Sequence, residues 1–278
     1  MRALPWFPAV LLAVLAAPSA CAQYAEGGAR VLALGRAGVA LGGETWGHVN
    51  PAARAEVEGM RAALQASRAY GLSELSLAAL AAAAPTPVGV LGLEARTYGF
   101  SERRETRVRA GFARALPLSV TRRIDVGVAL GVESVATEGY GNETTFLLDV
   151  GVQGQVLPGV RVGLAGRNLT GLGRSDEANL RVSAAAVPGL TVGFAYSPSE
   201  RATIVVDADH DEDFGLELRA GVEVLPVPML ALRAGVSSEP VRFTGGAGVV
   251  VGRLRADVAV EVHETLGVTP AVGLGVAF

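Results

Sequence analysis

Apolar and non-apolar residues alternate with a period of two along much of the chain. Bulky apolar residues alternate with glycine and alanine from Val272 to Phe278, so one face is apolar and the other nearly bare. Similar alternation covers residues 124–133, 214–224 and 253–262, where charged residues and glycine occupy the second face. Because successive side chains of a β-strand point to opposite faces, this period predicts strands.

The pattern predicts fourteen strands. An even number suits the antiparallel barrels of bacterial outer membranes, in which short turns lie on the periplasmic side and longer loops outside. Residues 178–187 resemble one more strand, but admitting it would invert every earlier loop, so we assign it to a long outer loop. The strands are expected at 59–69, 73–83, 87–98, 105–115, 123–136, 143–155, 159–168, 190–197, 200–208, 214–225, 228–237, 240–251, 252–262 and 268–278.

A soluble sandwich with a core face and a wet face explains the alternation of each strand equally well. Half of the residues are hydrophobic, which is high for a soluble domain. The longest uncharged stretch after the N-terminus, residues 75–93, is broken by Pro85 and Pro87 and makes a poor membrane helix. We therefore expect an all-β fold, a transmembrane antiparallel up-and-down barrel of about 14 strands, in the outer membrane of a Gram-negative-type bacterium. Phe278 is the expected assembly signal, read by the barrel-assembly machinery.

The first 22 residues are typical of a secretory signal peptide. Arg2 supplies the positive charge, residues 10–17 are apolar, and Ala20, Cys21 and Ala22 form a small-residue cleavage site. A lipoprotein signal at Cys21 is the alternative, although Pro18 stands where such a signal has leucine. Cleavage after Ala22 would remove the only cysteine and exclude disulfides and thiol catalysis.

Residues 23–56 are too polar and glycine-rich to span a membrane. We expect them to form an N-terminal hatch that plugs the lumen of a barrel built from residues 57–278. Small residues on the inward face leave room for such a plug, namely Gly127, Gly131, Gly163, Gly221 and Gly273.

Charged residues are also expected on the inner face. The net charge is −3 and the chain contains no lysine, which gives no support for nucleic-acid binding. Mixed signs suggest salt-bridged packing against the hatch rather than an ion-selective pore. The expected lumen charges are Arg219, Arg233, Arg253, Arg255, Asp257 and Glu261, with Arg161, Arg167, Asp125, Glu133, Asp149, Glu217 and Glu223 on the same face.

Candidates for catalysis or cofactor binding are few. Of the three histidines, His263 has no serine placed beside it, so we expect no enzyme activity and no cofactor. The acidic run at 207–213 could supply oxygens to Ca²⁺, but it lacks the EF-hand pattern and is better explained as a solvated outer loop. Glycines at 35–43 lack the strand and lysine of a phosphate loop. Arg103, Arg104 and Arg107 are either solvated or in contact with lipopolysaccharide phosphates.

A set of short motifs lies along the chain. Residues 28–30 and 34–41, which include Gly35 and Gly38, are followed by Asn50, Pro51 and Ala52. These motifs resemble the N-terminal signature of the PorV/PorQ-like outer-membrane proteins, relatives of the FadL long-chain fatty-acid transporters. Further matches are the loop motif Asn168-Leu169, where Thr170 replaces an expected glycine, and residues 232–235 and 256–259. The chain departs from the family in its few aromatics and in having His48 and Val49 before Asn50.

The resemblance implies a fourteen-stranded barrel with an N-terminal hatch and two candidate functions. The first is passage of hydrophobic or small molecules across the outer membrane. The alternative is a non-conducting accessory or cargo-receiving component of a type IX-like protein secretion system. Expected partners are outer-membrane lipids and lipopolysaccharide, the barrel-assembly machinery, and either a hydrophobic ligand or secretion-system proteins.

Overall fold

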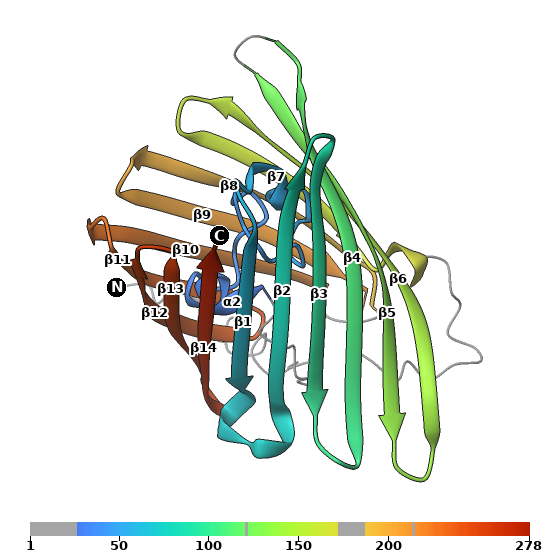
Figure 1. The fold of residues 1–278 in the computed structure, drawn as a ribbon. Helices are drawn as coiled ribbons and strands as arrows, with labels where there is room; N and C mark the ends of the chain where they lie inside the picture. The colour runs from blue at the N-terminus through green and yellow to red at the C-terminus, as the bar shows by residue number, and fades with distance from the viewer. Residues whose placement is uncertain (1–26, 120–121, 172–186, 213–214) are drawn as a thin grey trace, which may run out of the picture.

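A computed structural model describes residues 27–119, 122–171, 187–212 and 215–278. Fourteen antiparallel strands form a closed barrel in which each strand pairs with its chain neighbours and β1 pairs with β14 (Figure 1). The strands are β1 Arg61–Arg68, β2 Ser76–Thr86, β3 Gly89–Gly99, β4 Arg103–Pro117, β5 Arg123–Thr137, β6 Gly141–Leu157, β7 Val160–Arg167, β8 Gly189–Ser199, β9 Ala202–Asp211, β10 Gly215–Val227, β11 Leu230–Ser238, β12 Val241–Val251, β13 Leu254–His263 and β14 Gly267–Ala277.

The expected fold class and the number of strands are confirmed, while some boundaries move. Strand β2 starts three residues later than the alternation predicts, because two short 3-10 turns, η3 (Ala69–Gly71) and η4 (Ser73–Leu75), follow β1. Strand β9 extends to Asp211 rather than ending at 208. Most of the considered extra strand at 178–187 lies outside the described residues.

The two ends of the barrel differ in their connections. Arg61 at the start of β1 is level with Ala277 near the end of β14, so both lie at one end. Tight turns such as Leu157–Val160 and Val251–Leu254 join strands at that end. Longer connections such as 168–188 lie at the opposite end. By the usual rule for such barrels, the first end is periplasmic and the second is the outer end.

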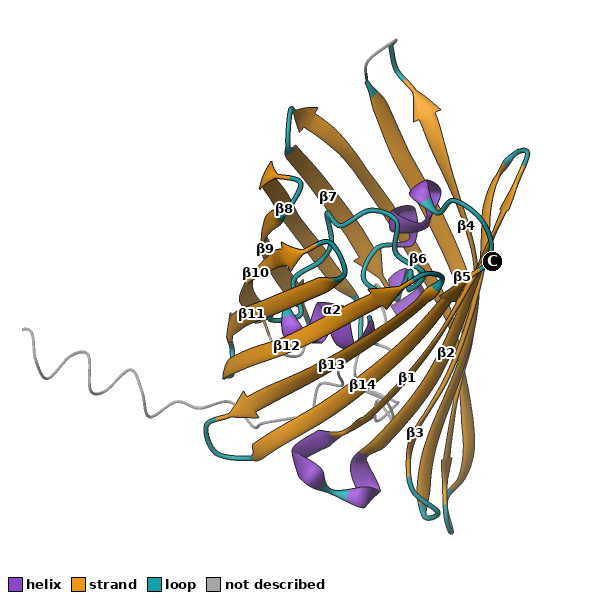
Figure 2. Cartoon of the chain, turned by 60° about the vertical axis from the view of Figure 1, so that its left-hand side comes forward, coloured by secondary structure: helices purple, strands orange, loops and turns teal. Residues whose placement is uncertain are grey.

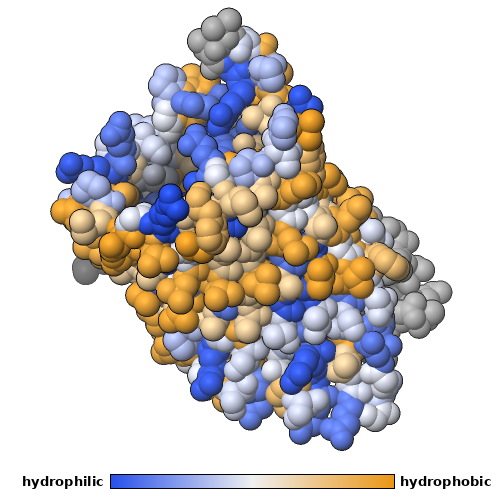
Figure 3. Space-filling view, in the orientation of Figure 1, coloured by the Kyte–Doolittle hydropathy of each residue, from blue (hydrophilic) through white to orange (hydrophobic). Residues whose placement is uncertain are grey.

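The two faces of the wall have opposite character. In β13, Val258, Val260 and Val262 are exposed on the outside, while Asp257 and Glu261, which alternate with them, are buried inside. Apolar residues gather in a band across the wall, with polar residues above and below it (Figure 3). A closed barrel has no unpaired backbone edge, so an apolar outer band suits it to span a bilayer.

Residues 27–57 lie inside the ring of strands (Figure 2); we call them the N-terminal segment. It contains helix α2 (Gly28–Ala33), against β12, β13 and β14, and the 3-10 helix η2 (Pro51–Glu56), against β4, β5 and β6. Helix α2 is short because Gly27 before it and Gly35 just after it adopt positive φ angles. Among the described residues, no helix is both long enough and apolar enough to cross a membrane.

Inward glycines let the backbone of this segment approach the wall. A Cβ atom at Gly221 would lie 2.4 Å from the carbonyl oxygen of Leu34, and one at Gly163 would lie 2.3 Å from that of Val39. A Cβ at Gly127 would lie 2.4 Å from the amide nitrogen of Ala52. Since real side chains cannot approach so closely, the bare inner face is a condition for housing the segment.

Two other inward glycines have different neighbours. Gly273 faces Ala29 of α2, whose Cβ lies 3.5 Å from the position that a Cβ at 273 would occupy. Gly131 instead makes room for the side chain of Arg109, at 2.6 Å. Four of the five predicted inward glycines therefore contact the N-terminal segment, and the fifth leaves space for a charged side chain of the wall.

Candidate functional site

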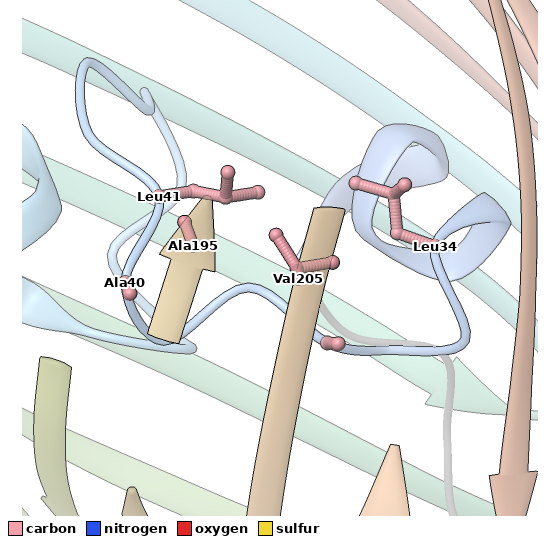
Figure 4. Close-up of a cluster of buried hydrophobic side chains, with 6 residues drawn as sticks. Leu34, Ala40, Leu41, Ala195 and Val205 are labelled. Carbon is pink, nitrogen blue, oxygen red and sulfur yellow. The ribbon is translucent and has the colours of Figure 1, made fainter. Parts of the chain in front are cut away.

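The first half of the N-terminal segment binds the wall through apolar and backbone contacts. Leu34, Ala40 and Leu41 form a buried cluster with Ala195 of β8 and Val205 of β9 (Figure 4), together with Ala37. The cluster lies on the inner face, where the segment and not lipid covers these two wall residues.

Both motif glycines of this half, Gly35 and Gly38, donate backbone hydrogen bonds to the wall. The amide of Gly35, whose φ is +69°, donates to the Thr244 hydroxyl at 2.9 Å. The amides of Gly38 and Val39 both donate to one carboxylate oxygen of Asp207, at 2.7 and 3.0 Å. These contacts satisfy backbone groups that burial would otherwise leave unpaired.

The Asn50-Pro51-Ala52 motif joins the two halves of the segment. The Asn50 side chain accepts a hydrogen bond from the amide of Ala52 at 3.0 Å and so caps η2, in which Pro51 is the first residue. Its amide nitrogen donates to the carbonyl of Val39 at 2.6 Å. Asn50 is fully buried, so both ends of its side chain are used in holding the loop between the halves.

Ion pairs fasten the segment to the barrel. Arg36 binds Glu261 through two hydrogen bonds of 2.8 and 2.7 Å. In the second half, Arg54 pairs with Glu94, and Arg30 near the start pairs with Glu223. The sequence placed Glu261 and Glu223 on the inner face but did not reveal their partners in the segment.

Glu56, the last residue of η2, binds two arginines of the wall at the periplasmic end. Arg161 donates to its two carboxylate oxygens at 2.8 and 2.6 Å, and Arg123 donates to one of them. Burial opposes ionisation of Glu56, but the hydrogen bonds and charges of Arg161 and Arg123 outweigh it and lower the pKa of Glu56 below its ordinary value.

The remaining inner-face charges pair with one another along the wall. Arg233 lies between Glu223 and Asp257, and its Nη1 is 2.7 Å from Oδ1 of Asp257. Arg255 binds the other oxygen of Asp257 at 2.6 Å. One expectation is wrong: Arg253 lies in the exposed turn between β12 and β13, because β13 begins at Leu254, two residues after its predicted start.

The loop motif Asn168-Leu169 lies where β7 ends. Asn168 has a positive φ of 53°, its amide donates to Asp149 at 2.8 Å, and its side chain donates to the carbonyl of Val187 at 3.0 Å. Leu169 opens the short turn η5 (Leu169–Gly171) and packs against Gly166. The pair anchors both ends of the long outer connection.

Two sequence interpretations of charged residues need correction. Asp207 and Asp209 are not in a solvated loop, since β9 continues past them and turns both inward. Oδ2 of Asp207 accepts hydrogen bonds from the N-terminal segment, and Asp209 pairs with Arg167 and Arg219. Within the described residues, the acidic run therefore forms no cluster that could hold Ca²⁺. Arg107 is likewise buried inside, paired with Glu133 at 2.9 Å, because alternation along β4 turns it inward.

The histidines occupy structural positions. His263 at the end of β13 accepts hydrogen bonds at Nδ1 from the backbone amides of Thr265 and Leu266, at 3.1 and 3.2 Å. His48 lies in the N-terminal segment and contacts Arg109, and His210 is exposed. These contacts fix the turn after β13 and the path of the segment.

Hollows border the N-terminal segment within the described part of the barrel. One of about 30 Å³ lies between Trp46, Leu77 and Ala79, which is room for a few water molecules but not for an organic solute. Another, of about 290 Å³, lies at the periplasmic end beside Leu41 and Glu56. The lumen is therefore filled in its middle by the N-terminal segment and is wider at the periplasmic end.

Comparison with solved structures agrees with this architecture. The chain is similar to the CymD monoaromatic hydrocarbon channel, with 12% identity, a TM-score of 0.63, and coverage of 90% of this chain and 97% of that one. It is also similar to the P. putida toluene transporter TodX, with 12% identity, a TM-score of 0.60 and coverage of 90% and 98%. A Pseudomonas aeruginosa FadL homologue gives 11% identity, a TM-score of 0.59 and coverage of 89% and 96%.

Sequence comparisons give no relative. No protein-family model matches the chain, and no curated protein matches it. At such low identity the structural likeness establishes the fold: the chain has the fold of the FadL-like outer-membrane barrels, in agreement with the expected outer-membrane location.

Proposed function

We propose that the protein passes small hydrophobic molecules across the outer membrane of a Gram-negative-type bacterium, with the N-terminal segment as its hatch. The observation that carries the proposal is the way in which this segment is held. It fills the lumen, yet hydrogen bonds and ion pairs at Glu56, Arg54 and Arg36 hold it. The pairs of Glu56 are partly exposed, so water can replace their hydrogen bonds. The fold shared with hydrocarbon channels supports this proposal.

Opening of the proposed hatch starts at the periplasmic end. There, Glu56 borders the 290 Å³ hollow, and Arg123, one of its two partners, is half exposed. Exposed ion pairs contribute little stability, so this end is held less firmly than the Arg36 end, where both partners are buried. Release of η2, followed by movement of the first half of the segment with α2, would join the two hollows into one path.

The resemblance of the N-terminal motifs makes a PorV/PorQ-like type the finer proposal. The type IX-like accessory role is the second candidate, and the filled lumen favours it, because a barrel that only receives cargo needs no solute path. Copurification from native membranes separates the two. A large secretion partner would favour the accessory role, and a bound hydrophobic molecule would favour passage.

Assembly is proposed to depend on Phe278. Its side chain is 67% exposed, and its amide donates to the carbonyl of Met60 at 2.9 Å. The backbone thus completes the seam between β14 and the start of β1, while the ring stays free for the barrel-assembly machinery.

Uptake by whole cells tests the proposed passage. A bilayer of phospholipid alone admits small hydrocarbons, so the barrier must be an outer leaflet of lipopolysaccharide. In a host without its own hydrophobic-solute channel, the protein should raise uptake of a labelled long-chain fatty acid or monoaromatic hydrocarbon. Uptake of a hydrophilic sugar should stay unchanged because the lumen is filled. Hydrocarbon and fatty-acid uptake equal to that of empty-vector cells, at verified surface expression, would contradict passage.

A further inference from the structure

A groove lies at the outer rim of β1 to β4, on the side of the wall that faces away from the lumen and the N-terminal segment. It has a volume of about 690 Å³ and lies on the outside of the wall, where Ala66 of β1 and Ala78 of β2 are opposite one another. Larger residues border it, with Val272 level with Ala66 and Thr97 level with Ala78. The small pair thus leaves a depression between strands.

Two arginines lie one level above this depression, toward the outer end. Arg68 is opposite Ser76, and Arg104 is opposite Gly99, so only small residues separate them along the wall. Because Leu77 is opposite Tyr98, the neighbouring residues Ser76 and Gly99 also lie side by side. The two arginines, on β1 and β4, are therefore three strand spacings apart, which is about 14 Å. Both arginines are exposed and line the groove.

These two arginines differ from those inside the barrel. Among the described residues, no carboxylate lies within salt-bridge distance of Arg68 or Arg104, whereas Arg103, next in the chain, pairs with Glu105 at 3.1 Å. Glu74 of η4 is near enough to Arg68 to interact with its charge, but the Glu74 carboxylate accepts a hydrogen bond from the Ser73 hydroxyl at 3.0 Å. The rim therefore presents two positive charges over an apolar groove.

We propose that this groove is a binding site for lipopolysaccharide, with Arg68 and Arg104 binding its phosphates and an acyl chain lying over Ala66 and Ala78. Guanidinium groups form paired, charge-assisted hydrogen bonds with phosphate. Two separated arginines suit a glycolipid that carries more than one phosphate. The groove lies at the outer end of the apolar band, where the outer leaflet has its headgroups, and Leu64 and Leu80 continue the apolar surface below it.

Lipid binding by the purified full-length protein tests the site. The probes are a short-chain lipopolysaccharide, its dephosphorylated form and phosphatidylglycerol, measured by native mass spectrometry and thermal melting in detergent. The double variant Arg68→Gln/Arg104→Gln should bind lipopolysaccharide roughly tenfold more weakly or worse. The control is Arg114→Gln, an exposed outward arginine of the same strand β4 at the periplasmic end, which should bind like the unmodified protein.

A second variant tests the groove without touching the charges. Ala66→Leu/Ala78→Leu fills the depression and should also weaken binding, while heat-modifiable gel mobility confirms that the barrel is folded. Equal binding by the arginine double variant, or by dephosphorylated lipopolysaccharide, would overturn the proposal. Equal binding of phosphatidylglycerol through the same arginines would replace lipopolysaccharide by a phospholipid and overturn the assignment of the ligand.

Discussion

Arginine appears on both faces of the barrel wall in opposite roles. On the inner face, Arg219 lies between Asp209 and Glu217, at 2.8 and 2.6 Å, and is almost fully buried. On the outer rim, Arg68 and Arg104 are exposed and have no carboxylate partner within the described part of the chain. A buried charge must be paired, because leaving it unpaired costs several kcal/mol, whereas a charge at a headgroup boundary can stay free for lipid. The inner arginines therefore stabilise the barrel through ion pairs, and the outer arginines are available to bind lipid headgroups.

The largest expected effect comes from breaking an inner pair. Glu261→Gln leaves the buried guanidinium of Arg36 without its charged partner and should lower the free energy of unfolding by about 3–5 kcal/mol. Trp46 lies in the N-terminal segment and reports its release by fluorescence during denaturant unfolding in detergent. The double variant Arg36→Gln/Glu261→Gln should be less destabilised than Glu261→Gln, and a larger loss in the double variant would refute mutual pairing.

A smaller loss of stability is expected when an inner glycine, but not an outer one, is replaced by alanine. Gly221→Ala places a Cβ 2.4 Å from the carbonyl of Leu34 and should cost about 1–3 kcal/mol of unfolding free energy, because the segment must shift. The matched control is Gly245→Ala on the lipid face of β12, where the nearest atom is 3.8 Å away. That change should stay within about 0.5 kcal/mol. Equal effects at the two positions, measured by the same denaturant unfolding, would contradict the close fit of segment and wall.

The smallest effect is a dependence on pH at the periplasmic end. The pKa of Glu56 is lowered in the folded protein, so its pairing stabilises η2 above the ordinary glutamate range and is lost as the pH falls through the lowered value. Hydrogen exchange of residues 51–57 should be faster in Glu56→Gln than in the unmodified protein at about pH 7. The difference should vanish at a lower pH at which Glu56 is protonated in the folded protein. A difference that persists at the lower pH would show that charge is not the cause.

Alternation predicted the strands and the faces of most residues, because lipid on one side imposes a strict period of two. It also predicted the inward glycines, four of which make room for the N-terminal segment. It misplaced Arg253, which lies one residue before β13 starts. Arg107 was expected to be solvated or in contact with lipopolysaccharide, although the alternation along β4 turns it inward.

The sequence could not predict which residues pair across the lumen. Arg36 and Glu261 are separated by more than two hundred residues, and neither has a local signal that names the other. The anchoring of Gly38 by Asp207 depends on the path of a segment with little regular structure. The one available clue was the presence of arginines in a segment expected to be enclosed, since enclosed arginines need carboxylates on the facing wall.

Locking the N-terminal segment to the wall tests the central claim most directly. Ala29→Cys/Gly273→Cys places two Cβ atoms about 3.5 Å apart, which is within the range of a disulfide. If the segment is a hatch, the oxidised double variant should lose uptake of the labelled hydrophobic solute, regain it on reduction, and differ from both single-cysteine variants. Unchanged uptake with the cross-link verified by mass spectrometry would contradict a moving hatch as the gate of this barrel.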